Sequence, residues 1–266
     1  GTTSAAGLGR ENPARETYFL TDAHKFEGYA WFRRSFTAGE WQGKQALLTL
    51  ERTRKTRVWL DGEEVCGLEA ADHDSLSTPH RYLLPALCPG EHTLLICVDN
   101  TDYPTRGGHM TSPDTQSNWN GITGEISLTV AESIVTALRV TAQGCALRVR
   151  AQVLGQQPEH AEVLLPGQPP QRVAIRQGSI DGICALTGSE ALWDEFSPKL
   201  HSLALRIGGD EYRTTFGLRV FHTEGRKLLC NEREVFLRGK HDGLNFPLTG
   251  YAPTDIDSWR RVLNTA

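Results

Sequence analysis

Short runs in which apolar and polar residues alternate fill the first half of the chain, and this pattern predicts half-buried β-strands. In YAWFRRSF (29–36), Ala30 and Phe32 alternate with Tyr29 and Trp31. The other candidate strands are QALLTLE (45–51), TRVWLDGEEVC (56–66), EHTLLICVDN (91–100) and GEISLTV (124–130). Turn residues separate these runs and no helical period is sustained, so we predict a β-sandwich.

Two runs of this block predict more than a strand. Asp61-Gly62 lies in the middle of 56–66 and is a strong hairpin signal, since these residue types tolerate the positive φ angles of a tight turn. The run 91–100 is apolar on both faces, which is typical of a strand in the centre of a sandwich.

A second block of strand-like runs extends from about Glu132 to Val220. Its members are ALRVTAQ, ALRVRAQVLG, AEVLLPG, QRVAIRQG, HSLALRIGG and YRTTFGLRVF. Their regular spacing, with turn residues between them, predicts a second and smaller sandwich of immunoglobulin-like size.

The last block changes character. KLLC and EVFLRG predict a hairpin around 231–233, and TDIDSWRRVLNTA (254–266) predicts an amphipathic helix. Thr254 is the expected N-cap, and the apolar residues Ile256, Trp259 and Leu263 recur at helical spacing. A strand, a loop and a helix make one βα unit, which buries its faces only against further copies.

Composition excludes several classes of partner. The chain is 39% hydrophobic and 23% charged with a net charge of −4, so we expect no nucleic-acid binding. No apolar run approaches the roughly 18 residues of a membrane span, and we expect no signal peptide because the first residues lack an apolar stretch. The six cysteines are irregularly spaced without a CxxC pair, so we expect neither a metal site nor a cofactor.

Four strings, taken in order, resemble glycoside hydrolase family 2, which includes β-galactosidases, β-glucuronidases and β-mannosidases. They are GYAWFRRSF (28–36), RVWLDGEEV (57–65), NWNGITGEISL (118–128), and LWDEFSPKLHSLAL (192–205) followed by FGLRVF and FLRG. The resemblance implies a jelly-roll, galactose-binding-like domain at 1–131, an immunoglobulin-like sandwich at 132–221, and the truncated start of a TIM barrel at 222–266. GKHDG after FLR, and CNERE without Asn-Gly, depart from the family pattern and indicate a divergent subgroup.

The resemblance also implies a retaining β-glycosidase, with a β-galactosidase-like enzyme favoured. Retaining glycosidases use two carboxyl groups about 5–5.5 Å apart, and in this family both lie late in the barrel. We therefore expect no catalytic residue in this chain, and no activity from it alone. Asn231-Glu232 matches the family's Asn-Glu dipeptide in letters only, because it falls in a predicted hairpin turn.

His241 and Asp242 directly follow the predicted first barrel strand. The C-terminal ends of barrel strands face the active site, so the resemblance implies that both residues contact the sugar. A carboxylate accepts hydrogen bonds from hydroxyl groups, and an imidazole can donate or accept. The alternative is that Asp242 ends the strand with a local backbone hydrogen bond.

The polar segment TDYPTRGGHMTSPDTQSNWN (101–120) is long enough to suggest a functional loop. The resemblance implies that it lends a polar residue to the rim of the active site, and Asp114, Gln116 and Asn118 are the polar candidates, with Asp114 favoured. Trp119 either stacks on a sugar face or anchors the loop to the sandwich, and the sequence leaves both open.

The expected partners are a β-glycoside and the rest of the catalytic barrel. A stand-alone carbohydrate-binding or structural sandwich module is the alternative interpretation. An unpaired strand edge and an apolar helix face also make self-association a specific expectation. The substrate class is typical of periplasmic or secreted enzymes, but the sequence leaves the compartment open.

Overall fold

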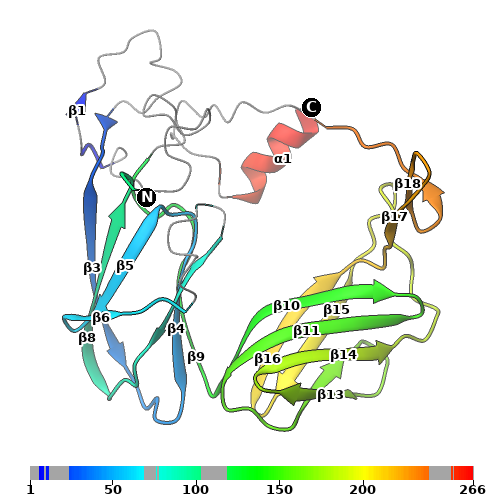
Figure 1. The fold of residues 1–266 in the computed structure, drawn as a ribbon, viewed down its shortest axis with the longest axis horizontal. Coiled ribbons are helices and arrows are strands. Elements are labelled where there is room, and N and C mark those ends of the chain that lie inside the picture. The colour runs from blue at the N-terminus through cyan, green and yellow to red at the C-terminus, as the bar shows by residue number, and fades with distance from the viewer. Residues whose placement is uncertain are drawn as a thin grey trace. The chain divides into compact units, whose positions relative to one another are not determined.

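The computed structural model of the chain describes residues 6–8, 10–11, 24–68, 76, 78–102, 119–239, 253 and 255–265. Strands dominate this part of the chain, as the alternating pattern predicts, and one helix is present in it (Figure 1). Two compact units are distinguished: unit 1 comprises Gly1–Gln42, Ala46–Thr129 and Lys240–Ala266, and unit 2 comprises Gly43–Gln45 and Val130–Gly239. The boundaries predicted at 131 and 221 stay predictions.

Unit 1 contains two larger antiparallel sheets and a short strand pair. The four-stranded sheet has the order β3-β8-β5-β6, formed by Tyr29–Ala38, Gly90–Asp99, Lys55–Leu60 and Glu63–Val65. The three-stranded sheet has the order β7-β4-β9, formed by His80–Leu84, Gln45–Leu50 and Ile126–Ala131. The short pair is β1 (Arg10–Glu11) with β2 (His24–Lys25).

The local signals of the first block are confirmed. Strand β8 lies between β3 and β5, which is the central place that its two apolar faces predict. Asp61 and Gly62 join β5 to β6 with φ angles of 50° and 92°, the positive values that a tight hairpin turn requires. Both larger sheets supply fully buried side chains, including Val58 and Val98 from the first and Leu50 from the second.

Unit 2 is built on a seven-stranded antiparallel sheet with the order β10-β11-β14-β13-β12-β15-β16. Its strands are Ser133–Gln143, Ala146–Gly155, Ser179–Ala185, Gln171–Arg176, His160–Leu164, His201–Ile207 and Asp210–Phe216, in that spatial order. The end strands β10 and β16 contact each other, so the sheet nearly closes around one core. Leu147, Val163 and Leu205 lie in that core with no exposed surface.

Strand β14 is absent from the sequence-based prediction. Its run SIDGICA carries Gly182 at an interior position, which weakens a strand signal. The structure gives the reason for this glycine: a Cβ there would lie 2.5 Å from Cγ1 of Val173 on the neighbouring strand β13. The glycine that hides the strand from a pattern search is therefore the residue that allows its close packing.

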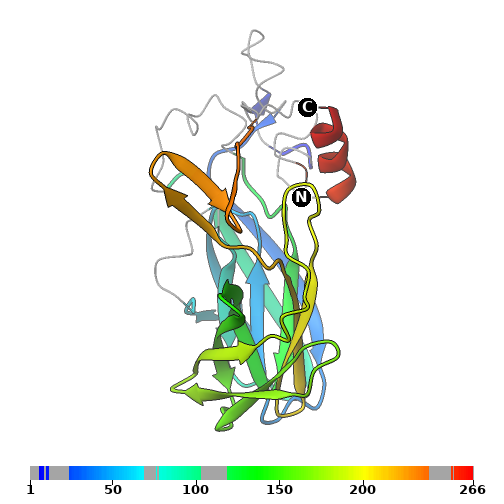
Figure 2. The same cartoon turned by 90° about the vertical axis from the view of Figure 1, so that its right-hand side faces the viewer.

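The third block begins with a small sheet of β17 (Phe221–Glu224), β18 (Lys227–Cys230) and β19 (Arg233–Glu234), shown in orange in Figure 2. The predicted hairpin is confirmed, with Asn231 and Glu232 as its turn. The strand predicted to continue through FLRG is wrong for this structure, because residues 235–239 form no strand. A strand needs a hydrogen-bonded neighbour over several residues, whereas the backbone N–H of Val235 donates to the Leu228 carbonyl at 2.8 Å and no strand pairing continues beyond Val235 among the described residues.

Helix α1 (Ile256–Thr265) is confirmed, but its predicted N-cap is corrected. Oδ1 of Asp255 accepts the backbone N–H of Ser258 at 2.7 Å, so Asp255 caps the helix, while Thr254 lies outside the described residues. No residue of α1 is buried. The helix is also too short to cross a membrane, as is every helix in the described part of the chain.

Candidate functional site: the base of the 103–118 segment

Four of the five predicted sugar-contacting residues lie outside the described residues: Asp114, Asn118, His241 and Asp242. Their contact with substrate stays a prediction. The fifth, Trp119, is only 5% exposed. This burial favours the anchoring role over the stacking role, because little of the indole face is accessible to a ligand.

Asn120, which follows Trp119, ties three segments of the chain together. It is 1% exposed, and its Nδ2 donates to the backbone oxygens of Gly28 at 2.9 Å and Val98 at 3.0 Å. A side-chain amide has two N–H donors, and both are used here to bind backbone carbonyls of two separate segments. Asn120 is thus a buried structural residue, next to the buried Trp119.

Asn100 completes this arrangement on the other side of the segment. Its Nδ2 donates to the carbonyl of Phe26 at 2.7 Å, and its Oδ1 accepts the N–H of Gly28 at 3.0 Å. The two asparagines also approach each other, with Nδ2 of Asn120 3.4 Å from Oδ1 of Asn100. They define what we call the asparagine clamp, which holds residues 100 and 120 together through hydrogen bonds to the same part of the chain, 26–28.

Sequence reasoning missed the clamp, although it singled out the neighbouring Asn118 and Trp119. A signal was present: Asn100 ends a buried strand, and Asn120 precedes Gly121, whose φ of 128° is unfavourable for other residues. However, these hydrogen bonds bring together segments 26–28, 98–100 and 119–120, which are far apart in the sequence. The spacing of hydrophobic residues along the chain does not predict such a contact.

Charged residues lie at the end of β8 and on the neighbouring residues 54–55. Oδ1 of Asp99, which is 7% exposed, accepts the backbone N–H and the hydroxyl of Thr101 at 2.7 and 2.6 Å. Lys55 and Asp102 form an ion pair at 2.5 Å. Arg54 is 2% exposed. These residues fix the direction in which the chain leaves β8, and they give the base of the segment a strongly polar character.

A buried hydrogen-bonded network lies on β5 and β7. Oγ1 of Thr56 lies 2.6 Å from Nδ1 of His80 and 2.8 Å from the hydroxyl of Tyr82, which in turn donates to the Thr56 carbonyl. Burial raises the pKa of Tyr82 to about 12, against the lowering effect of the hydrogen bond to Thr56. The phenol therefore stays protonated at neutral pH, and the network is structural.

The dipeptide Asn231-Glu232 shows no arrangement for acid catalysis. Asn231 accepts the N–H of Val220 through Oδ1 at 2.9 Å and donates to the carbonyls of Trp193 and Leu218. The Glu232 side chain is 84% exposed at the tip of the hairpin. In the described part of the chain no three His, Cys, Asp or Glu residues gather in a metal-binding arrangement, and all six cysteines are free thiols.

Comparison with known proteins gives a result at the level of fold. No protein-family model and no curated protein matches the sequence. Among solved structures, the chain is similar to the β-glucuronidase from Ruminococcus gnavus in complex with uronic isofagomine, with 21% identity and a TM-score of 0.60 over 83% of this chain and 41% of that chain. For the same enzyme in complex with D-glucaro-d-lactam the values are 20% and 0.61, over 88% of this chain and 46% of that chain. The chain therefore spans less than half the length of these structures and shares the fold of part of a β-glucuronidase.

Proposed function

We propose that the chain is the N-terminal, non-catalytic portion of a retaining β-glycosidase of the family 2 type. Its jelly-roll and immunoglobulin-like sandwiches support a catalytic barrel that begins within 222–266. The observation that carries the proposal is the fold likeness to a β-glucuronidase over 83% of this chain, together with four family-like strings in the expected order.

The proposed reaction is hydrolysis of an O-glycosyl bond by the whole protein. The sequence resemblance favours a β-galactoside, whereas the solved relatives are β-glucuronidases, so both sugars belong in the test. The asparagine clamp gives the sandwich a role in this proposal. It fixes residues 100 and 120, on either side of the 103–118 segment, and we assign Asp114 and Asn118 of that segment to the active-site rim, together with His241 and Asp242.

The test compares this chain with the product of the same coding sequence read past Ala266. We expect no release of nitrophenol from nitrophenyl β-galactoside or β-glucuronide by the chain alone, because both carboxyl groups of the reaction would lie further along. We expect turnover of one of them by the longer product. Turnover by the chain alone, or a reading frame that continues into no barrel, would refute the proposal.

A stand-alone carbohydrate-binding module is the second candidate, and one observation favours it. On the outer face of the four-stranded sheet, Tyr29 is 64% and Trp31 is 56% exposed, and the rings of Trp31 and Trp59 are 5.2 Å apart. Exposed aromatic patches often mark ligand-binding surfaces. Calorimetry with mono- and oligosaccharides tests this candidate: Trp31→Ala should abolish binding without unfolding the chain, whereas sugar binding unaffected by Trp31→Ala would exclude this face.

A further inference from the structure

The two larger sheets of unit 1 leave an apolar cavity between them. The cavity has a volume of about 530 Å³ and lies between strands β3 and β9. Each of these strands ends its sheet, so the seam between the sheets is open on this side. Side chains from both sheets form the walls, including Phe32, Phe36, Leu94, Leu48 and Leu128. This volume is within the roughly 300–1,000 Å³ of small-molecule sites.

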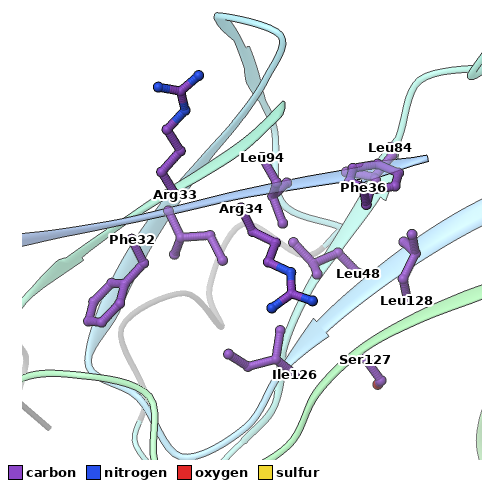
Figure 3. Close-up of a pocket in the computed structure, with 11 residues that line it drawn as sticks. Phe32, Arg33, Arg34, Phe36, Leu48, Leu84, Leu94, Ile126, Ser127 and Leu128 are labelled. Atoms are coloured by element: carbon purple, nitrogen blue, oxygen red, sulfur yellow. The ribbon is translucent and has the colours of Figure 1, made fainter. Parts of the chain in front are cut away.

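A cation faces this apolar space. Arg34 pairs with Leu94 in the β3–β8 register and therefore shares the inward face of the sheet with Phe32 and Phe36, since side chains alternate along a strand. Figure 3 shows the Arg34 guanidinium pointing towards Ile126, across the cavity, whereas the neighbouring Arg33 extends away from it. Arg34 is nonetheless exposed, so its charge stays in contact with water at the open edge of the cavity, as is usual for an arginine.

The electrostatics of the cavity are one-sided. Arg34 forms no hydrogen bond or ion pair with any residue that the structure describes. Among the residues that the structure describes, the polar ones lining the cavity are Arg33, Arg34 and Ser127, and none of these is a carboxylate. A guanidinium beside apolar walls is best complemented by an anion, since it offers a planar fork of N–H donors that matches a carboxylate.

We propose that this cavity is a binding site for an amphiphilic carboxylate, an alkyl or aryl acid whose apolar body fills the seam and whose carboxylate pairs with Arg34. The apolar walls stabilise the body by removing it from water. Arg34 supplies orientation and the preference for an anion. The site is independent of the proposed glycosidase function, because it lies within unit 1 and involves none of the predicted sugar contacts.

Isothermal titration calorimetry with sodium octanoate on the whole chain tests the proposal, with octan-1-ol as the neutral analogue of the same tail. We expect octanoate to bind about threefold to fivefold more tightly than octanol, because an ion pair at an exposed site contributes up to about 1 kcal/mol. Arg34→Gln should remove this preference by weakening octanoate binding about threefold to fivefold. Arg226→Gln is the control, because Arg226 is an exposed arginine of unit 2 that does not line the cavity, and it should leave the affinity unchanged.

A second variant tests the cavity itself. Ile126 is 54% exposed at the edge of the cavity, so Ile126→Trp fills the seam without disturbing the buried core. It should abolish binding of both octanoate and octanol, with the unfolding temperature unchanged. The proposal is overturned by equal affinity for octanol and octanoate, by equal effects of the two arginine variants, or by no binding heat up to the solubility limit. It is also overturned if sedimentation shows a dimer that Ile126→Trp dissociates, since a second copy would then occupy the seam.

Discussion

At the scale of single residues, a packing contact between Gly217 and Trp193 explains why two of the family-like strings contain these residues. Gly217, in FGLRVF, lies against the indole of Trp193, in LWDEF, so closely that an added Cβ would be 2.9 Å from Cδ1 and 3.1 Å from Cβ of the tryptophan. Arg219 stacks over the Trp193 ring, with its guanidinium carbon 4.4 Å from the ring centroid. The glycine of FGLRVF thus allows the Trp193 side chain to approach the backbone more closely than any other residue would.

Gly217→Ala is therefore expected to destabilise unit 2. The added methyl group forces the rigid indole or the backbone to move, and overpacking of this kind costs roughly 1–3 kcal/mol. The matched control is Gly209→Ala, because a Cβ at Gly209 meets nothing within 4 Å. Urea unfolding of both variants measures the difference, and equal midpoints would show that the Trp193 contact does not restrict residue 217.

The turn after β5 contains a second residue-scale feature, a carboxylate paired with a histidine. Oδ2 of Asp61 lies 2.6 Å from Nδ1 of His92, and Oδ1 accepts the N–H of Thr93 at 2.7 Å. The Thr93 hydrogen bond, and then His92, hold the pKa of Asp61 below its ordinary 3.8. The Cys88 carbonyl, and then Asp61, raise the pKa of His92 above its ordinary 6.5.

These opposite shifts predict a pH window for the stabilising effect of the pair. The histidine contribution is fully present below 6.5 and is lost as pH rises through the raised pKa, whereas the aspartate contribution is present above 3.8 and is lost as pH falls through the lowered pKa. His92→Gln should therefore lower the unfolding temperature most between these values and least in alkali. His160→Gln, at an exposed site, is the control, and a difference between the two variants that does not vary with pH would refute the assignment.

At the scale of elements, the β18–β19 hairpin turn adopts a backbone conformation that its sequence disfavours. Asn231 and Glu232 have φ angles of 48° and 64°, the left-handed values of a type I′ turn, for which Asn-Gly is the preferred pair. Asparagine tolerates the left-handed conformation, and the Asn231 side chain also makes three hydrogen bonds with backbone groups. Glu232 does not, because a Cβ in the left-handed region costs roughly 1–2 kcal/mol.

Glu232→Gly is expected to stabilise the chain. Relief of the left-handed strain outweighs the larger chain entropy that glycine loses on folding, which is about 0.5–1 kcal/mol, so a net gain of about 0.5–1 kcal/mol should remain. Arg226→Gly, in the turn between β17 and β18, is the control, since Arg226 has no positive φ and its replacement should destabilise. The midpoint of thermal unfolding is measured for both variants and for the unchanged chain. A midpoint for Glu232→Gly below that of the unchanged chain would contradict the argument.

The elements that the sequence predicts correctly are those specified by local chemistry. The Asp61-Gly62 turn, the two-faced strand β8 and helix α1 each follow from neighbouring residues alone. Strand β14 was missed because its glycine, Gly182, is required by the close approach of Val173 on another strand. A strand was wrongly predicted at 236–239 because strand formation depends on pairing with a neighbouring strand, which local sequence does not specify. The asparagine clamp was missed for the same reason, since its carbonyl partners come from segments far apart in the chain.

At the scale of the whole molecule, each unit buries its own apolar residues. Unit 2 has a contiguous core to which β11 to β16 all contribute, and unit 1 buries side chains from both of its larger sheets. Separate cores of this kind are the property that defines domains able to fold alone. The two units are therefore expected to respond separately to damage in their interiors.

Two leucine-to-alanine variants test this independence. Leu50 in unit 1 and Leu205 in unit 2 are both 0% exposed, so each change leaves a comparable cavity and should cost about 2–5 kcal/mol. In calorimetric scans of the full chain, Leu50→Ala should lower the temperature of one transition and Leu205→Ala that of the other, and the double variant should show both shifts. Additivity is expected because the altered sites belong to different units with cores of their own. A single transition lowered equally by either variant would show instead that the sandwiches unfold as one cooperative body.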